Sequence, residues 1–303
     1  MSFLDKWLTG REEKALSDAG LVDPSRFHCR RPVESSIVEM LAASPTLKVF
    51  QFHDVKPNEQ TLRLLNDLLF SNRKDITLRV YGYSDTWADI NFLRSLPELE
   101  RFDFDTKVFG SNEPLYSLKR LVHLGLGFTQ PKPKITIEFL ADFAGSIESL
   151  SLEGDYRDLR NTIPRLSKLN TVWFSSTKLE NLEFLDGLKL RTFGNYGGRV
   201  KNFECLRRIT TLKRLWLKTN ATLESIDFVE DLLELESLEL YYLAKIKSIP
   251  RLDKHKKIQR VMAYACNRLS DISSLKSLPA SVKVLASGNA LRRPYVSDSF
   301  SLS

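Results

Sequence analysis

The chain has 303 residues, of which 45 are Lys or Arg and 38 are Asp or Glu, giving a formal net charge of +7. No segment approaches the ~20 consecutive apolar residues that a membrane helix needs, so we expect no membrane span. Acidic and basic residues are interleaved through most of the sequence. This pattern indicates a mixed, solvated surface rather than a tail that binds nucleic acid.

The cysteines are few and lie far apart in the sequence: Cys29, Cys205 and Cys266. An odd number at such spacing does not predict a disulfide framework and favours a reducing compartment. The N-terminal segment has no continuous apolar stretch, because charged residues such as Asp5 and Lys6 interrupt it, so no secretory signal is predicted. We therefore expect a cytoplasmic protein, and the alternative is an effector that is secreted.

The first part of the chain, residues 1–45, is predicted to be a helical cap. The segment FLDKWLTGREEKALSDAGL is amphipathic enough to cover the first structural unit behind it. In SSIVEML, Ser36 and Glu39 have the spacing of a capping box, which predicts the start of a further helix. RFHCR, from Arg26, indicates a degenerate strand, so residues 26–45 are a candidate for an irregular first repeat.

One motif, L-x-x-L-x-L, recurs with small variations from Leu47 onward. Its fourth position is occupied in turn by Phe50, Leu78, Phe102, Leu124, Leu150, Val172, Phe193, Leu215, Leu238, Val261 and Val284. Successive fourth positions lie 21 to 28 residues apart. A period of this size over so many copies is typical of a stacked repeat protein, in which each unit buries its apolar side against its neighbours.

This pattern resembles the leucine-rich-repeat family, and the resemblance extends roughly from Arg26 to Leu291. It implies an α/β solenoid with a curved parallel β-sheet on the concave side and short 3₁₀ or α turns on the convex side. About eleven repeats are expected over residues 46–291. Segments such as LEFLDGLKL are similar to the short-repeat subclass of bacterial internalins and Sds-type phosphatase regulatory subunits. The family prefers Asn or Cys at the ninth position, where only Asn220, Cys266 and Asn289 match, so we expect an irregular coil.

The second half of each repeat predicts what covers the outer side of the sheet. Apolar residues at every third position indicate short 3₁₀ or α turns. Longer helices are expected only in the two longest units, at TLRLLNDLLF from Thr61 and at IEFLADFAGS from Ile137. The C-terminal segment RRPYVSDSFSLS has no repeat pattern, and residues 292–303 are predicted to be a flexible tail.

The third, fifth, seventh and eighth positions of each motif are predicted to point into the hollow, because side chains alternate along a strand. Aromatic residues occupy these positions in five successive repeats, and Trp, Tyr and Arg are the residues most enriched in binding hot spots. The predicted partner-binding residues are Trp173, Tyr196, Arg214, Trp216, Lys218, Glu239, Tyr241, Arg260, Tyr264, Arg79, Tyr81 and Asp103. The alternative is that the aromatic side chains stack on one another and merely shield the sheet.

The predicted hollow has two further features, a pair of glycines without side chains and a pair of aspartates. Gly125 and Gly127 predict a floor without side chains, which would leave room for a loop or helix of the partner. Asp103 and Asp105 share one face of a strand, close to Arg79. A salt-bridged polar patch is favoured there over a cation site or an acid–base pair.

Catalysis has little support in the sequence. The histidines show no metal-binding spacing, and His28 and Cys29 should lie on opposite faces of one strand. GNYGG, residues 194–198, is placed at a strand exit and is predicted to be a turn rather than a phosphate-binding loop. We therefore predict no enzyme, no catalytic residue, no metal, no cofactor and no small-molecule substrate.

The predicted function is that of a monomeric, non-enzymatic scaffold that holds another protein on its concave face. A cytoplasmic regulator or an inhibitor that neutralises a toxin would both fit. The alternative is a nucleic-acid-binding solenoid, in which basic residues contact phosphates and aromatic residues stack on bases. Protein is the favoured partner, because acids such as Glu239 and Asp103 on the same face would repel a phosphate backbone.

Overall fold

A computed structural model of the chain describes residues 20–53, 55–82, 89–106, 110–128, 135–291 and 293–297. These residues belong to two compact units, Met1–Ile135 and Thr136–Ser303, here called unit 1 and unit 2. The helix predicted in FLDKWLTGREEKALSDAGL falls on residues outside the described part of the chain, apart from the last residues of that segment.

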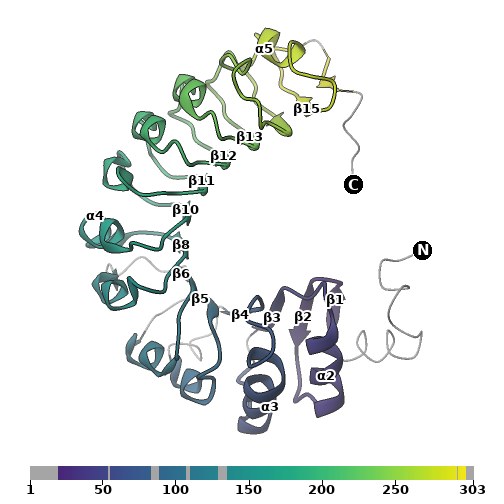
Figure 1. Cartoon of the computed structure of the whole chain (residues 1–303), viewed down its shortest axis with the longest axis vertical. Coiled ribbons are helices and arrows are strands. Elements are labelled where there is room, and N and C mark those ends of the chain that lie inside the picture. The colour runs from purple at the N-terminus through teal and green to yellow at the C-terminus, as the bar shows by residue number, and fades with distance from the viewer. Residues whose placement is uncertain are drawn as a thin grey trace. The chain divides into compact units, whose positions relative to one another are not determined.

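Unit 1 is a succession of strands with a helical segment after most of them, coloured purple to blue in Figure 1. Its strands are β1 (Leu21–Asp23), β2 (Arg26–Cys29), β3 (Val49–His53), β4 (Thr77–Gly82), β5 (Arg101–Thr106) and β6 (His123–Phe128). Its helices are α2 (Ser35–Ala43), α3 (Glu59–Leu64), the π-helix η2 (Leu65–Phe70) and the 3₁₀ helices η4 (Asn91–Ser95) and η5 (Glu113–Ser117). Strands β2 to β6 pair in parallel and in chain order, and β1 pairs antiparallel with β2.

Unit 2 repeats the same arrangement, with strands along one side and helical turns along the other, from teal to yellow in Figure 1. Its strands are β8 (Ser149–Glu153), β9 (Tyr156–Arg157), β10 (Thr171–Ser175), β11 (Thr192–Tyr196), β12 (Arg214–Lys218), β13 (Ser237–Tyr241), β14 (Arg260–Tyr264), β15 (Lys283–Ala286) and β16 (Tyr295–Val296). Its helices are η6 (Glu138–Phe143), α4 (Leu159–Thr162), η7 (Ile163–Arg165), η8 (Glu183–Leu185), η9 (Glu204–Arg208), η10 (Asp227–Asp231) and α5 (Ser273–Lys276). β7 (Ile135–Thr136) lies at the boundary of the units.

The strand register confirms the repeat that the sequence predicts. In unit 2, the fourth-position residues face one another across consecutive strands: Leu150, Val172, Phe193, Leu215, Leu238, Val261 and Val284. In unit 1, Phe27 of β2 begins the same row, which continues through Phe50, Leu78, Phe102 and Leu124. All of these side chains are buried. The degenerate strand expected at RFHCR is therefore present, and the apolar rows form a continuous core within each unit.

The outer side carries short 3₁₀ and α turns, as the spacing of apolar residues predicts, apart from α2 with its 9 residues and one longer helical segment. Residues Glu59–Phe70 form α3 followed directly by η2, so the longest repeat does contain a longer helix. The second expected long helix is wrong, because η6 is a 3₁₀ helix of 6 residues. The expected capping box is also wrong: the N-cap of α2 is Glu34, which makes no side-chain cap bond, and Ser36 lies inside the helix.

The ninth position is as irregular as its sequence suggests. Asn220 is buried, donates to the Val200 carbonyl oxygen and accepts from the backbone N–H groups of Thr222 and Leu223. This is the turn-stabilising role that the family resemblance implies. Asn289 is exposed, however, so its match to the consensus does not produce a buried ladder bond.

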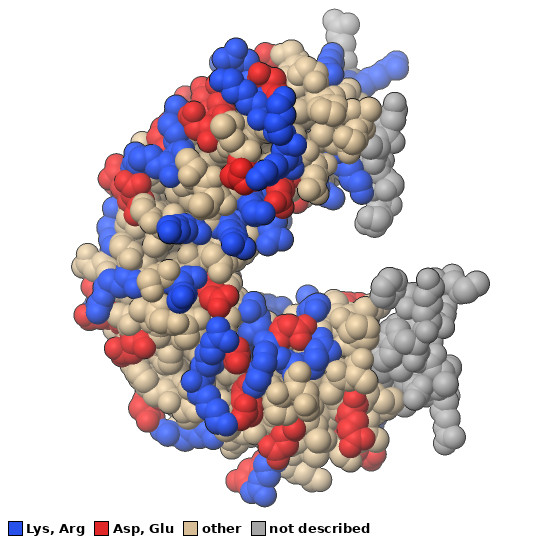
Figure 2. Space-filling view, in the orientation of Figure 1, with Lys and Arg blue, Asp and Glu red and all other residues tan. Residues whose placement is uncertain are grey.

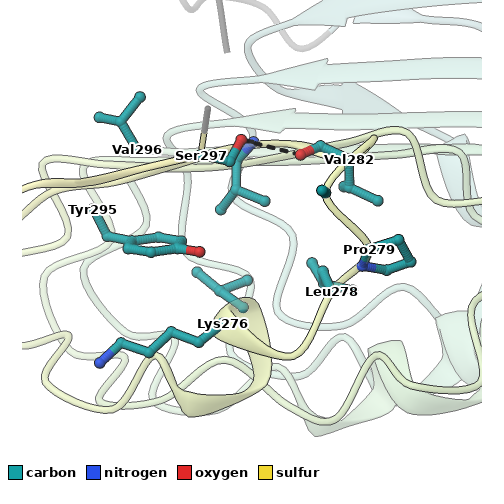
Figure 3. A pocket seen from close by; sticks show the side chains of 10 residues that line it. Lys276, Leu278, Pro279, Val282, Tyr295, Val296 and Ser297 are labelled. Atoms are coloured by element: carbon teal, nitrogen blue, oxygen red, sulfur yellow. Dashed lines mark hydrogen bonds between the residues drawn. The ribbon is translucent and has the colours of Figure 1, made fainter. Parts of the chain in front are cut away.

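The C-terminal end of unit 2 has more structure than its patternless sequence suggests. β16 pairs antiparallel with β15, and Ser297 anchors it by accepting a hydrogen bond from the Val284 N–H and donating to the Val282 carbonyl oxygen. A hollow of about 340 Å³ lies beneath this strand, and Figure 3 shows Tyr295 and Lys276 on one side of it and Leu278 and Pro279 on the other. Backbone groups of the last repeat strand are therefore satisfied by the chain itself within the described residues.

Candidate partner-binding face

The side chains at the third, fifth and seventh positions of β10 to β15 form one surface, here called the inner face of unit 2. Alternation along each strand places them opposite the buried fourth and sixth positions, as in β12, where Leu215 and Leu217 are buried and Arg214, Trp216 and Lys218 are not. Nine predicted site residues lie on this face: Trp173, Tyr196, Arg214, Trp216, Lys218, Glu239, Tyr241, Arg260 and Tyr264. The other three belong to unit 1.

The aromatic side chains of the inner face of unit 2 contact one another, and Trp216 is at their centre. Its ring centroid lies 5.3 Å from that of Trp173, 6.4 Å from that of Tyr196 and 5.7 Å from that of Tyr241. Tyr241 in turn lies 6.5 Å from Tyr264. All five predicted aromatics thus form one cluster with edge-to-face or tilted geometry, which favours mutual packing. Part of their surface remains uncovered, since Tyr196 and Tyr264 are each 43% exposed.

Gly194 makes the contact between the two tryptophans possible. Trp173 and Trp216 lie on strands β10 and β12, and Gly194 occupies the same register position on β11 between them. A Cβ at Gly194 would lie 1.9 Å from Cε3 of Trp173, so the Trp173 ring fills the space of the missing side chain. The prediction that the whole GNYGG segment is a turn is therefore wrong for Gly194, which is inside a strand. Gly197 and Gly198, with positive φ angles, do form the turn.

A hydrogen-bonded network surrounds Glu239 on β13. Its carboxylate accepts from the Tyr241 hydroxyl at 2.6 Å and from the Ser237 hydroxyl at 3.2 Å, and Arg260 lies 3.7 Å away. Arg260 also donates to the sulfur of Met262. Burial, together with the bond to the Glu239 carboxylate, raises the pKa of Tyr241 to about 12. The phenol therefore remains a hydrogen-bond donor across the neutral range. Glu239 carries the only carboxylate at these positions of β10 to β15, and Arg260 and two hydroxyl groups contact it.

Beside the tryptophans the inner face has an open hollow of about 250 Å³, lined by Thr171, Trp173, Thr192, Arg214, Leu215, Trp216, Ser237 and Glu239. Small hydroxyl side chains form its floor, and Arg214 stands at one side with Nε donating to the Thr192 hydroxyl at 3.1 Å. Lys218 lies above the rings, with Nζ 4.7 Å from the Tyr196 centroid and 5.7 Å from that of Trp216. Thr192 and Ser237 carry no sequence signal beyond their place in the register, and the sequence prediction omits them.

In both units, then, every repeat buries its consensus apolar positions and turns the intervening ones to the other side of a parallel sheet whose strands follow chain order. Short helical turns close the outer side of each repeat. The chain is a leucine-rich-repeat solenoid.

Comparison with known proteins concerns the structure alone, since no protein-family model and no curated protein matches the sequence. An internalin (inlF) from Listeria monocytogenes aligns with 90% of this chain and 86% of its own, at 16% identity and a TM-score of 0.46. Internalin C2 from the same organism aligns with 84% of this chain and 92% of its own, at 16% identity and a TM-score of 0.44. TLR13, solved in complex with ssRNA13, aligns with 87% of this chain but 43% of its own, at 14% identity and a TM-score of 0.46.

The predicted site residues of unit 1 of the solenoid lie on β4 and β5. Arg79 donates to the Asp105 carboxylate from Nε at 2.8 Å, and its guanidinium lies 4.8 Å from the Tyr81 ring centroid. Burial raises the pKa of Asp105 although the Arg79 guanidinium opposes that shift. Asp103 is hydrogen-bonded to Nε2 of His123 at 2.8 Å. The expected salt-bridged patch is therefore present.

The bare floor expected at Gly125 of the solenoid is wrong. A Cβ on Gly125 would lie 2.0 Å from Oδ1 of Asp103, so the Asp103 carboxylate already covers this position on the neighbouring strand. Gly125 makes room for the Asp103 side chain of unit 1 and leaves no space there for a loop or helix of a partner.

The described residues contain no group of three or more His, Cys, Asp or Glu side chains that could hold a metal ion. All three cysteines are free and buried, and burial raises the pKa of each thiol to about 11. Such thiols carry little thiolate at neutral pH and are poor nucleophiles. Among the helices that the structure describes, none has the length and apolar character that a bilayer crossing requires.

Proposed function

We propose that this solenoid is a non-enzymatic scaffold that binds a partner protein on the inner face of unit 2. The observation that carries the proposal is the cluster of Trp173, Tyr196, Trp216, Tyr241 and Tyr264 on five consecutive strands. Trp and Tyr anchors with a few charged neighbours are typical of the residues that dominate binding energy at protein interfaces.

The cluster is both rigid and incompletely covered. Each ring is held by its neighbours, so binding a partner would restrict the side-chain rotamers only slightly. The conformational-entropy cost of binding is therefore small. The exposed fractions of Tyr196 and Tyr264 leave apolar surface that only a second molecule can remove from water. Stacking of the aromatic rings on one another is therefore compatible with partner binding, because it holds the rings in place before a partner binds.

A nucleic-acid ligand fits the same face less well. Base stacking needs accessible ring faces, whereas Trp216 is surrounded by Trp173, Tyr196, Tyr241 and the ammonium of Lys218. The Glu239 carboxylate also lies in the middle of this face. The free buried cysteines support a reducing, cytoplasmic setting for the interaction, in which the solenoid would act as a monomeric regulator or as an inhibitor of another protein.

The experiment is an affinity purification from the cells in which the chain is native, comparing the wild-type solenoid with a Trp216→Ala, Tyr241→Ala double variant. A matched control is Tyr116→Ala, because Tyr116 is also an exposed tyrosine but belongs to unit 1. We expect a protein that the wild type and Tyr116→Ala retain and that the double variant loses. Circular dichroism establishes that both variants remain folded.

Two results would contradict the proposal. A partner retained equally by the double variant would move the site away from the inner face of unit 2. A retained fraction that disappears on nuclease treatment would identify nucleic acid as the ligand.

A further inference from the structure

Resting on the proposed function, we infer that the partner segment bound beside Trp173 and Trp216 is acidic. It places a carboxylate on Arg214 and an adjacent apolar or aromatic side chain in the hollow beside the indoles. The inference concerns the chemistry of the occupant, and the charge distribution and size of the hollow carry it.

Some charged residues outside the inner face of unit 2 are paired with the next repeat. Arg208 contacts Asp186, Lys213 contacts Glu236 and Lys245 contacts Glu224, each at 2.7 to 2.9 Å. Figure 2 accordingly shows basic and acidic side chains alternating along the outer rim of unit 2. Where opposite charges pair in this way, the surface has little net attraction for a charged partner, because the charges screen one another.

The inner face of unit 2 has a different charge balance. Strands β11 to β15 carry Arg214, Lys218, Arg260 and Lys283 at outward positions, against the single acid Glu239. Glu239 is satisfied by Tyr241, Ser237 and Arg260. Among the ion pairs between described residues, none involves Arg214, Lys218 or Lys283. These three cations therefore form no ion pair in the described structure, although Arg214, after the hydrogen bond from Lys213, helps to lower the pKa of the Glu236 carboxyl.

Arg214 is placed to act as the anchor for a carboxylate. It is exposed, and its hydrogen bond runs from Nε to Thr192, so its two terminal nitrogens make no hydrogen bond in the described structure. A guanidinium presents parallel N–H donors that match a carboxylate in a bidentate pair. Because the indoles beside it exclude water from one side, such a pair would be stronger here than on an open surface.

The size of the hollow selects a side chain rather than a free small molecule. Its volume of about 250 Å³ is smaller than the ~300–1,000 Å³ of pockets that bury drug-sized ligands. Two indole walls and a floor of threonine and serine suit one apolar or aromatic group next to the carboxylate. A phosphodiester chain could use the same cations, but its bases would meet ring edges instead of free ring faces.

The test uses synthetic peptides and fluorescence anisotropy on the full chain at physiological salt. The probe is a labelled short peptide of alternating Asp and Phe, compared with the matched Asn–Phe and Lys–Phe peptides and with a single-stranded oligothymidylate. We expect the Asp–Phe peptide to bind most tightly. Arg214→Gln should weaken it about 10- to 100-fold, since charge-assisted hydrogen bonds contribute about 1.5–3 kcal/mol and ~1.4 kcal/mol corresponds to tenfold.

A matched control variant separates a specific anchor from general charge attraction. Arg165→Gln removes an exposed cation from η7 on the outer side of unit 2 and should leave affinity within twofold. Arg214→Lys keeps the charge but loses the fork geometry, so we expect an intermediate affinity.

The inference is overturned if the Asn–Phe peptide binds as well as Asp–Phe, if Arg165→Gln costs as much as Arg214→Gln, or if the oligothymidylate binds more tightly than every peptide. Its failure is distinguishable from failure of the proposed function. If the Trp216→Ala, Tyr241→Ala variant still loses the native partner while no acidic preference is found, the binding face stands and only the acidic occupant is wrong.

Discussion

The inner faces of the two units use the same strand positions for different chemistry. On β4 to β6 of unit 1, both carboxylates are matched by a basic group on a neighbouring strand, Asp105 by Arg79 and Asp103 by His123. Tyr81 is stacked on His53 with centroids 4.3 Å apart. On β10 to β15 of unit 2, aromatic residues pack together, Arg260 is paired with Glu239, and Arg214, Lys218 and Lys283 form no ion pair in the described structure.

This difference indicates which surface is complete by itself. A charge that is paired within the chain gains little from a partner, since binding would exchange one ion pair for another. A half-covered aromatic cluster beside unpaired cations still has apolar area to bury and hydrogen bonds to make. The contrast therefore supports the proposal that a partner binds unit 2, with the charged residues of β4 to β6 in a structural role.

The largest expected effect tests the register on which this contrast depends. Leu215→Asp should destabilise unit 2 by more than about 4 kcal/mol, because it places an unpaired charge in the core. Arg214→Asp, the same new residue one position earlier on the exposed side, should change stability by less than about 1 kcal/mol. Thermal melts followed by circular dichroism compare them, and equal melting temperatures would mean that the inner face is wrongly assigned.

The aromatic cluster of unit 2 depends on Gly194 in a way that can be measured. Gly194→Ala should cost about 1–3 kcal/mol, because the new Cβ would collide with the Trp173 ring and force it away from Trp216. Gly145→Ala is the control, since a Cβ there meets no atom within 4 Å, and a change within about 0.5 kcal/mol is expected. Urea titrations and tryptophan fluorescence give both readouts, and a neutral Gly194→Ala would show that the indole contact is dispensable.

A pair of identical substitutions compares the two faces directly. Arg79→Gln should lower stability by about 1 kcal/mol, because it leaves the partly buried Asp105 carboxylate without its partner. Arg214→Gln should be nearly neutral for stability, since the Glu236 carboxylate near it is already paired with Lys213, yet should weaken partner binding. If the stability losses were reversed, the division into a self-paired face and a binding face would be untenable.

The smallest expected effect is a pH dependence in unit 2. The pKa of Tyr241 is raised to about 12, so above pH ~10 the unfolded chain loses this proton while the folded chain keeps it. Folding stability should therefore fall between about pH 10 and 12, and it should fall less steeply in Tyr241→Phe. Urea titrations at several alkaline pH values measure how steeply the free energy of unfolding falls with pH in the wild type and in Tyr241→Phe. Equal slopes would contradict the raised pKa of Tyr241 and its hydrogen bond to Glu239.

Several features follow from the sequence alone. A fixed period with Leu, Ile, Val or Phe at the fourth position determines a parallel stack, because each repeat can bury its apolar side only against its neighbours. Side chains alternate between the two faces of a strand, and this period of two places Trp173, Trp216 and Tyr264 on one face. Even the first strand, at Arg26–Cys29, could be found by stepping back one repeat from Phe50.

The tertiary structure decided which side chains meet across neighbouring strands. The sequence of a single repeat does not contain this information. The local sequence around Gly194 indicates a turn. Only the pairing of β10 with β11 shows that Gly194 leaves the space that the Trp173 ring occupies. Gly125 is likewise covered by Asp103 from the adjacent strand. Asn195 occupies a sixth position where neighbouring strands have Phe174 and Leu217, and its buried amide finds no hydrogen-bond partner in the described structure. Periodicity determines which way a side chain points, whereas the neighbour across the sheet determines what it meets there.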